Sequence, residues 1–141
     1  MSYRIDHSES IPKLVERLKR EHRELGLKLD RILELSESGN LRVAESTLLS
    51  ISQEILRHAV EEEARIIQVI ADNAKGDLER SAEIMRHHRR IEEFLKEKLP
   101  HLSELPPSRT KQEIKNFVLE LRKHHKEEEE ISFPIALRVS K

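Results

Sequence analysis

The sequence predicts an all-α protein, an up-down-up-down four-helix bundle, on three observations. Apolar residues recur three or four positions apart along four long segments, which is the spacing of one face of an α-helix. Only 3 Gly and 5 Pro occur in 141 residues, and they fall mainly at the breaks between these segments. Most of the breaks are short, and short connections between long helices favour antiparallel neighbours. A bundle therefore accounts for the whole pattern.

The chain length allows one domain with a single core. We expect residues 1–10 to form an N-terminal tail and residues 11–141 to form the bundle. The first helix should begin after Ser10, a good N-cap residue, and end near Glu37. Gly39 follows at a position suited to a left-handed cap.

The second helix is predicted over residues 41–71 and the third from a cap at Asp77 to about Leu99. A Pro-rich irregular connection then covers residues 100–108. Thr110 and Glu113 have the spacing of a capping box for the fourth helix, which Pro134 should kink or end.

Polar side chains interrupt the apolar seams of these helices at helical spacing. The seam of the fourth helix, for example, contains Ile114, Phe117, Leu121, His124, Glu128, Ile131 and Ile135. The six polar seam residues of the four helices are His22, His58, Glu62, His88, His124 and Glu128. They are predicted to meet in the interior of the bundle.

A single offset relates the two halves of this set. His58 and His124 are 66 residues apart, as are Glu62 and Glu128, and as are His22 and His88. Each half therefore contains a helix with one seam His and, 36 residues later (22 to 58, 88 to 124), a helix with a His-x-x-x-Glu pair. On a helix, that pair projects from one face.

Buried ionised carboxylates are costly unless a positive charge neutralises them. Two of them beside four imidazoles predict a pair of metal ions, with Glu62 and Glu128 placed to bridge. The chain has no Cys, so the ligands must be imidazole and carboxylate, a combination that suits iron best and manganese next.

Each motif also has an ordinary structural interpretation. One His-x-x-x-Glu pair is more often a surface ion pair than a metal site, and one seam His is more often a hydrogen-bonded core residue. The joint occurrence of six such residues under one offset favours the metal site.

Further acids and histidines flank the six residues. Glu61, Glu63, Glu127, Glu129 and Glu130 are expected to lie at the surface or to hydrogen-bond to the ligands, and Glu129 could replace Glu128 if the helix turned slightly. His125 falls at the edge of its seam and is expected to be exposed or outside the ligand set. The 66-residue offset favours His88 over its neighbour His87. His7 and His101 should face solvent.

Composition excludes several classes of function. The formal net charge of −1 gives no electrostatic reason to expect a nucleic acid or an anionic membrane as partner. No apolar run approaches the length of a membrane span, and the first residues lack the apolar core of a signal peptide. We therefore expect a cytoplasmic protein, with no protein partner identified.

The order of these residues resembles the hemerythrin-like, or HHE cation-binding, domain. The resemblance spans roughly residues 11–138, and it rests on the His at the start of each half and on the motif His124-x-x-x-Glu128-Glu129-x-x-x-Phe133-Pro134. It implies a bundle that holds two iron ions with an oxo or hydroxo bridge. His22, His58, His88 and His124 would then be terminal ligands, with Glu62 and Glu128 bridging.

The sequence departs from the oxygen-carrying hemerythrins at Ile84, where their additional His would lie. Its four His and two Glu are similar instead to the di-iron domain of proteins that repair iron-sulfur centres, although the Cys-containing segment of those proteins is missing. We therefore expect a non-haem di-iron protein that reacts with or senses O₂, NO or peroxide, in a sensing, scavenging or stress-protective role.

Two alternatives remain open at this point. The chain could be an iron buffer, or an iron donor for cluster repair, without redox chemistry of its own. It could also be an interaction module whose helical surface changes with the metal state. The sequence does not establish whether the protein is an enzyme, and oxidation of an organic substrate is the least favoured function.

Overall fold

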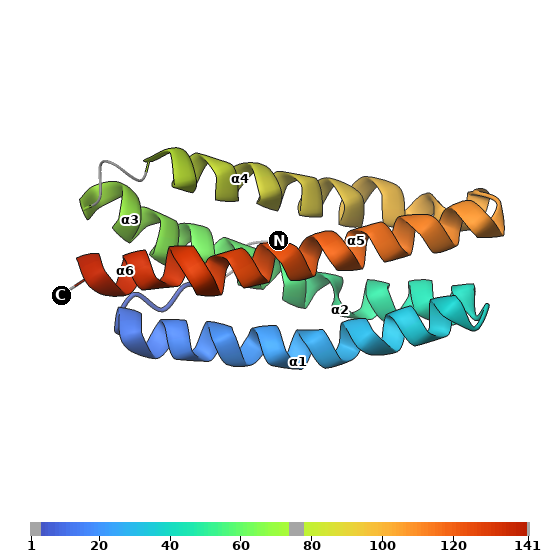
Figure 1. Ribbon diagram of the computed structural model, residues 1–141, viewed down its shortest axis with the longest axis horizontal. Helices are drawn as coiled ribbons and strands as arrows, with labels where there is room; N and C mark the ends of the chain where they lie inside the picture. Colours follow the sequence, from blue (N-terminus) through green and yellow to red (C-terminus); the bar gives the residue numbers. More distant parts are fainter. Residues whose placement is uncertain (1–3, 74–77, 141) are drawn as a thin grey trace.

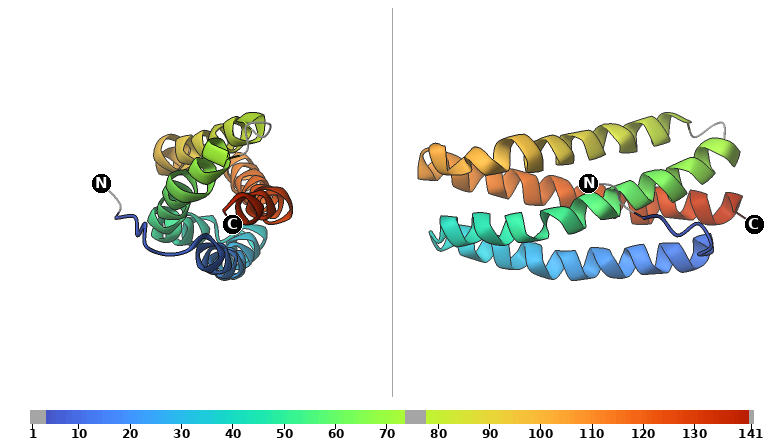
Figure 2. Two further views of the ribbon diagram at one scale, coloured as in Figure 1. Left: turned by 90° about the vertical axis from the view of Figure 1, so that its left-hand side faces the viewer. Right: turned by 180° about the vertical axis from the view of Figure 1, so that it is seen from behind.

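A computed structural model describes residues 4–73 and 78–140. All regular secondary structure in these residues is helical, which confirms the all-α class. Four helical rods lie lengthwise beside one another, and the end-on view shows them around a common axis (Figures 1 and 2). None of the described helices is both long and apolar enough to cross a membrane.

The first rod is a single α-helix, and each of the other three joins α-helical segments to π-helical or 3₁₀-helical ones. The first is α1 (Ile11–Glu37), and the second joins α2 (Leu41–Glu61), the π-helical η1 (Glu62–Ile67) and α3 (Gln68–Asn73). The third joins α4 (Leu78–Glu93), the π-helical η3 (Phe94–Lys98) and the 3₁₀-helical η4 (Leu99–Glu104). The fourth joins α5 (Pro107–Glu127), the π-helical η5 (Glu128–Ser132) and α6 (Phe133–Val139).

The ends of α1 lie where the sequence predicts them. The Ser10 hydroxyl accepts a hydrogen bond from the backbone N–H of Lys13 at 3.4 Å. At the other end Gly39 has a φ of +87°, a left-handed conformation that strains residues with a side chain. The backbone N–H of Asn40 then donates to the carbonyl of Leu35 and closes the helix. The predicted cap at Asp77 lies outside the described residues.

The connection before the fourth helix differs from the prediction. Much of the segment that was expected to be irregular forms the helix η4. The helix α5 begins at Pro107, so the predicted capping box at Thr110 is wrong. Proline is well suited to the first turn of a helix because its N–H is not needed there. The Thr110 hydroxyl donates instead to the carbonyl of Leu102 at 2.7 Å, which ties α5 to η4.

Two of the π-helical segments begin at the carboxylates that interrupt the seams. The segment η1 starts at Glu62 and η5 starts at Glu128. A π turn contains about one residue more than an α turn, so the helix face that follows is displaced by one position. The wider turn of η5 also precedes Pro134, and the rod continues through α6 to Val139.

The displaced face changes which residues reach the core. Ile131, predicted in the seam of the fourth helix, is 36% exposed, whereas Ser132 is buried. In the second rod, Ile70 is fully buried although α-helical spacing predicts its neighbour Val69. Beyond the two carboxylates the seam predictions are therefore correct at Ile66 and Ile135 and wrong by one residue at Val69 and Ile131.

The apolar core is divided into two clusters. One contains residues of the distal part of α1 such as Leu25 and Leu29, together with Ile114 of α5. The other contains Leu14 and Leu18 of the first turns of α1, together with Ile66, Ile70 and Phe133. His22 lies between Leu18 and Leu25 on α1, so a polar layer separates the two clusters.

The displaced register predicts unequal costs for two identical substitutions. Ile70→Ala should destabilise the protein by about 2–5 kcal/mol because it leaves a cavity in a fully buried site. Ile131→Ala should change the stability by no more than about 0.5 kcal/mol because the side chain lies at the surface. Urea unfolding of the two variants measures both values, and similar losses would contradict the displaced register.

Candidate metal centre

The six polar seam residues are all buried in the polar layer between the two apolar clusters. None of them is more than 6% exposed: His22, His58, Glu62, His88, His124 and Glu128. They come from all four rods, with one His from α1, one from α4, and a His and a Glu from each of the other two. The burial predicted from the seams is therefore confirmed for every one of them.

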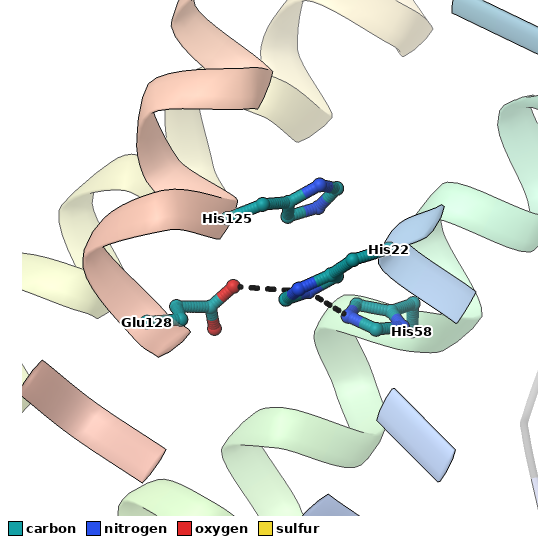
Figure 3. A group of neighbouring side chains, drawn as sticks. All are labelled: His22, His58, His125 and Glu128. Atoms are coloured by element: carbon teal, nitrogen blue, oxygen red, sulfur yellow. Dashed lines mark hydrogen bonds and ion pairs between the residues drawn. The ribbon is translucent and has the colours of Figure 1, made fainter. Parts of the chain in front are cut away.

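These side chains form two groups that could each hold a metal ion. In the first group, ligand atoms of His22, His58, His125 and Glu128 lie within 4.8 Å of one another (Figure 3). The Nε2 atoms of His22 and His58 are 2.9 Å apart, and the Nε2 atom of His22 is 3.5 Å from Oε1 of Glu128. One carboxylate therefore faces two imidazoles across the bundle.

The second group contains Glu62, His88, His124 and the same Glu128. The Nε2 atom of His124 is 3.3 Å from Oε1 of Glu128, the oxygen that also faces His22. Glu128 is thus shared by the two groups.

Glu62 faces both sides of the layer with different oxygens. Its Oε1 lies 3.2 Å from Nε2 of His88, and its Oε2 lies 3.1 Å from Nε2 of His58. A carboxylate in this position can bind one ion with each oxygen. The two imidazole pairs, His22 with His58 and His88 with His124, therefore lie on opposite sides of two shared carboxylates.

Three atoms at the middle of this layer are buried without a well-aligned hydrogen bond, although Nε2 of His88 lies 3.2 Å from Glu62 and Nε2 of His124 lies 3.3 Å from Glu128. They are the Nε2 atoms of His88 and His124 and the Oε1 atom of Glu128. An unsatisfied buried polar atom costs about 1–3 kcal/mol, and native proteins rarely retain several together. All three are lone-pair atoms suited to a metal ion, so the residues present fit such a centre.

The outer nitrogens of three imidazoles contact carboxylates. The Nδ1 atoms of His22, His58 and His88 lie 3.0, 2.8 and 3.1 Å from carboxylate oxygens of Glu129, Glu21 and Glu63. A metal-binding His usually donates its second N–H to such an acceptor, which fixes the ring and leaves the other nitrogen free for the ion. Here that free nitrogen is Nε2, the one that faces the centre.

Arginines hold two of the surrounding acids. Arg17 of α1 donates to Glu21 at 2.9 Å and also pairs with Glu61. Arg57 pairs with Glu61 and lies 3.4 Å from Glu21. Glu61 is only 6% exposed, so the expectation that it could lie at the surface is wrong. It belongs instead to an ionic network that joins α1 to α2.

The pKa values of three imidazoles are high. Burial lowers the pKa of His22, but contacts with Glu128 and Glu62 outweigh it and raise the value to about 9. Burial also lowers the pKa of His58 and of His88, but nearby carboxylates outweigh it and raise the pKa of each imidazole to about 9. These rings therefore bind a proton more strongly than an ordinary imidazole when no cation neutralises the carboxylates. Because the Nε2 atoms of His22 and His58 are 2.9 Å apart, only one of these two rings carries a proton on Nε2 at a time.

The pKa values of the remaining buried groups shift in both directions. Burial and the charges of neighbouring imidazoles lower the pKa of His124 to about 3 and lower that of His125 well below its ordinary value. Burial and the negative charge of Glu62 raise the pKa of Glu128 well above its ordinary value. The pKa of Glu62 is lowered, because His58 and other neighbours outweigh the effect of burial.

His125 is buried, so the expectation that it could be exposed is wrong. It is 8% exposed, and its ring stacks on that of His22 with centroids 3.9 Å apart and planes 14° from parallel. Two nearly parallel stacked rings cannot direct lone pairs at one ion, so His125 would bind only after its ring turned. The signal was the second His of the 124–125 doublet, but a single helix does not reveal that α1 packs over that side of α5.

The other histidines lie outside the layer. His7 and His101 are exposed, as predicted. His87 is half-buried and groups with Glu83 and Glu127, whose ligand atoms also come within 4.8 Å of one another. Its Nδ1 atom lies 3.1 Å from Nδ1 of His124.

A hollow between α1 and α5 reaches the first group. It has a volume of about 920 Å³, and its lining includes His22, His125 and Gly26. A Cβ atom added to Gly26 would meet no atom within 4 Å, so a side chain at this position can project into open space. The hollow therefore borders the polar layer at His22 and His125.

Comparison of the chain with known protein families, with curated proteins and with solved structures found no match. The class of protein therefore has to be inferred from the structure itself. It is an all-α protein with a buried layer of His and Glu side chains that could hold metal ions.

The pKa values predict how the stability of the metal-free protein depends on pH. The values of about 9 for His22, His58 and His88 exceed the 6.5 of an ordinary imidazole. The stability that these three imidazoles contribute to the folded protein is therefore fully present below pH 6.5 and is lost as the pH rises through 9. His124, with its pKa near 3, acts in the opposite direction and lowers stability as the pH falls below 6.5.

Urea unfolding of the metal-free protein between pH 5 and 10 should consequently show maximal stability at about pH 6.5. The metal-loaded protein is the control. Its loss of stability between pH 6.5 and 9 should be smaller, because imidazoles that bind an ion are neutral. A stability of the metal-free protein that rises over that interval would contradict the assignment.

Proposed function

We propose that this chain is an up-down-up-down four-helix bundle of the hemerythrin-like kind that binds two iron ions and reacts with or senses O₂, NO or peroxide. The observation that carries the proposal is the set of unsatisfied buried atoms, Nε2 of His88 and His124 and Oε1 of Glu128. Groups of this chemistry in an apolar interior are explained by ions that bind them.

The geometry suggests how the ligands divide. His22 and His58 would hold one ion, His88 and His124 the other, and Glu62 and Glu128 would bridge them. Six side chains around two ions leave coordination positions for water or a small ligand. This division agrees with the terminal and bridging roles that the family resemblance implies.

The donor set favours iron. Mixed imidazole and carboxylate ligation with open positions is typical of non-haem iron, and manganese or a mixed pair is the next choice. Two bound iron ions would supply one-electron redox chemistry and a place where a small oxidant binds. The chain itself would supply neutral Nε2 donors, with the Nδ1 protons directed to Glu129, Glu21 and Glu63.

Access by small ligands distinguishes this function from that of an iron buffer. A buffer has to release its ions readily, whereas the six proposed ligands are at most 6% exposed and lie between two apolar clusters. The hollow at Gly26 instead provides a path to the layer for a diatomic molecule or a peroxide. We place the protein in the cytoplasm, in a sensing, scavenging or stress-protective role.

Replacement of a bridging carboxylate by its neutral isostere tests the metal centre. Glu128→Gln should reduce the iron content of the purified protein from two ions per chain to one or none, because Glu128 is shared by both groups. Glu130→Gln, two residues away and exposed, is the matched control and should retain two. Metal analysis and the absorption spectrum with and without azide provide the measurement.

Three outcomes would contradict the proposal. The wild-type protein could contain no iron or manganese, or Glu128→Gln could retain as much metal as Glu130→Gln. Rapid loss of iron to a chelator together with inertness towards O₂, NO and peroxide would favour the iron buffer.

Substitution of Gly26 tests the path of access. Gly26→Leu should slow the binding of azide or NO severalfold without changing the metal content, because the new side chain projects into the hollow. Gly26→Ala is the control: it should leave the rate unchanged and stabilise α1 by about 0.5–1 kcal/mol. Stopped-flow absorption measures the rates, and equal rates in all three proteins would contradict this path.

A further inference from the structure

The four imidazoles of the proposed centre differ in the residue that contacts Nδ1, the ring nitrogen that faces away from the centre. His22, His58 and His88 each have Nδ1 next to a carboxylate oxygen. His124 instead has Nδ1 3.1 Å from Nδ1 of His87, a second imidazole. Of the four contacts, only this one lacks an acid.

The difference affects how strongly each ring binds a cation. A carboxylate that accepts the Nδ1 proton increases electron density on the ring and strengthens the donor at Nε2. An imidazole can accept the same proton, but it is neutral or positive in every common protonation state. His87 therefore fixes the ring of His124 without adding the negative charge that the other three rings receive.

The acids near His87 do not replace that charge. Glu83 and Glu127 gather around His87 itself, in the half-buried group outside the layer. No hydrogen bond between His124 and a carboxylate at Nδ1 occurs among the described residues. The contact with His87 is thus the one that sets the outer environment of His124.

We propose that the two metal positions are unequal, and that the position of His88 and His124 is the weaker because His87 stands where the other imidazoles have a carboxylate. The inference rests on the proposed metal centre. It makes His87 a positioning residue that acts through His124. The position of His88 and His124 then fills last and releases its ion first.

Stepwise binding of Co²⁺ to the metal-free protein tests the inequality without redox chemistry. Calorimetry and the visible absorption of bound Co²⁺ should resolve a tighter and a weaker step. Because Oδ of Asp lies as many bonds from the backbone as Nδ1 of His, His87→Asp puts a carboxylate behind His124. It should tighten the weaker step about 10–100-fold and leave the tighter step unchanged. His87→Asn, of the same shape but neutral, should leave both steps close to wild type.

Two further variants identify which step belongs to which position. Glu63→Gln removes the charge behind His88, and Glu129→Gln removes the charge behind His22. The two acids are closely matched, with side chains 33% and 36% exposed. Glu63→Gln should weaken the weaker step and Glu129→Gln the tighter one, each about 10–100-fold.

The inference is overturned if the wild-type steps are equal, if His87→Asp moves neither step or moves both alike, or if His87→Asn tightens the weaker step as much as His87→Asp does. If His87→Asp does not fold by circular dichroism, the Gln pair decides, and movement of the same step by both variants overturns the inference. Absence of Co²⁺ binding to the wild-type protein would overturn the proposed centre as well, so the two failures are distinguishable.

Discussion

Two carboxylates buried between two apolar clusters set the conditions for the rest of the structure. Glu62 and Glu128 are each 1% exposed, and the layer that holds them separates the two apolar clusters. Packing alone would favour Leu or Ile at both positions, as at the neighbouring seam positions. Retaining the carboxylates costs several kcal/mol without a compensating charge, and neighbouring imidazoles with raised pKa values contribute such charge in the metal-free protein.

The surrounding fold serves to position this layer. The π turns η1 and η5 begin at the two carboxylates, and each widens the helix where two side chains of one rod must face the centre. Outside the layer, Glu21 contacts His58 and is itself held by Arg17, so an ionic network extends from the imidazole to the surface. The central nitrogens are consequently oriented by contacts that lie in the half-buried shell of the bundle rather than by the apolar core.

Much of this arrangement could be predicted from the sequence, because a regular α-helix repeats its buried face faithfully. In α1, residues spaced three or four positions apart from Leu14 to Ile32 are buried on one face, and the six polar seam residues all reach the interior as predicted. The prediction failed at Ile131 because periodicity cannot anticipate a π turn. The sequence also left open whether His125 is exposed or lies beside the ligands, because a helical wheel of α5 alone does not show that α1 covers that side. The partners of the outer nitrogens could not be assigned individually, because they depend on how neighbouring rods are rotated.

The account depends on cations occupying the polar layer, and anomalous X-ray scattering from crystals of the iron-loaded protein tests this most directly. We predict two peaks at the iron edge, one next to Nε2 of His22 and His58 and one next to Nε2 of His88 and His124, with Glu62 and Glu128 between them. Crystals of the iron-loaded protein with no peak in this layer, or with a peak only at the half-buried group of Glu83, His87 and Glu127, would contradict it.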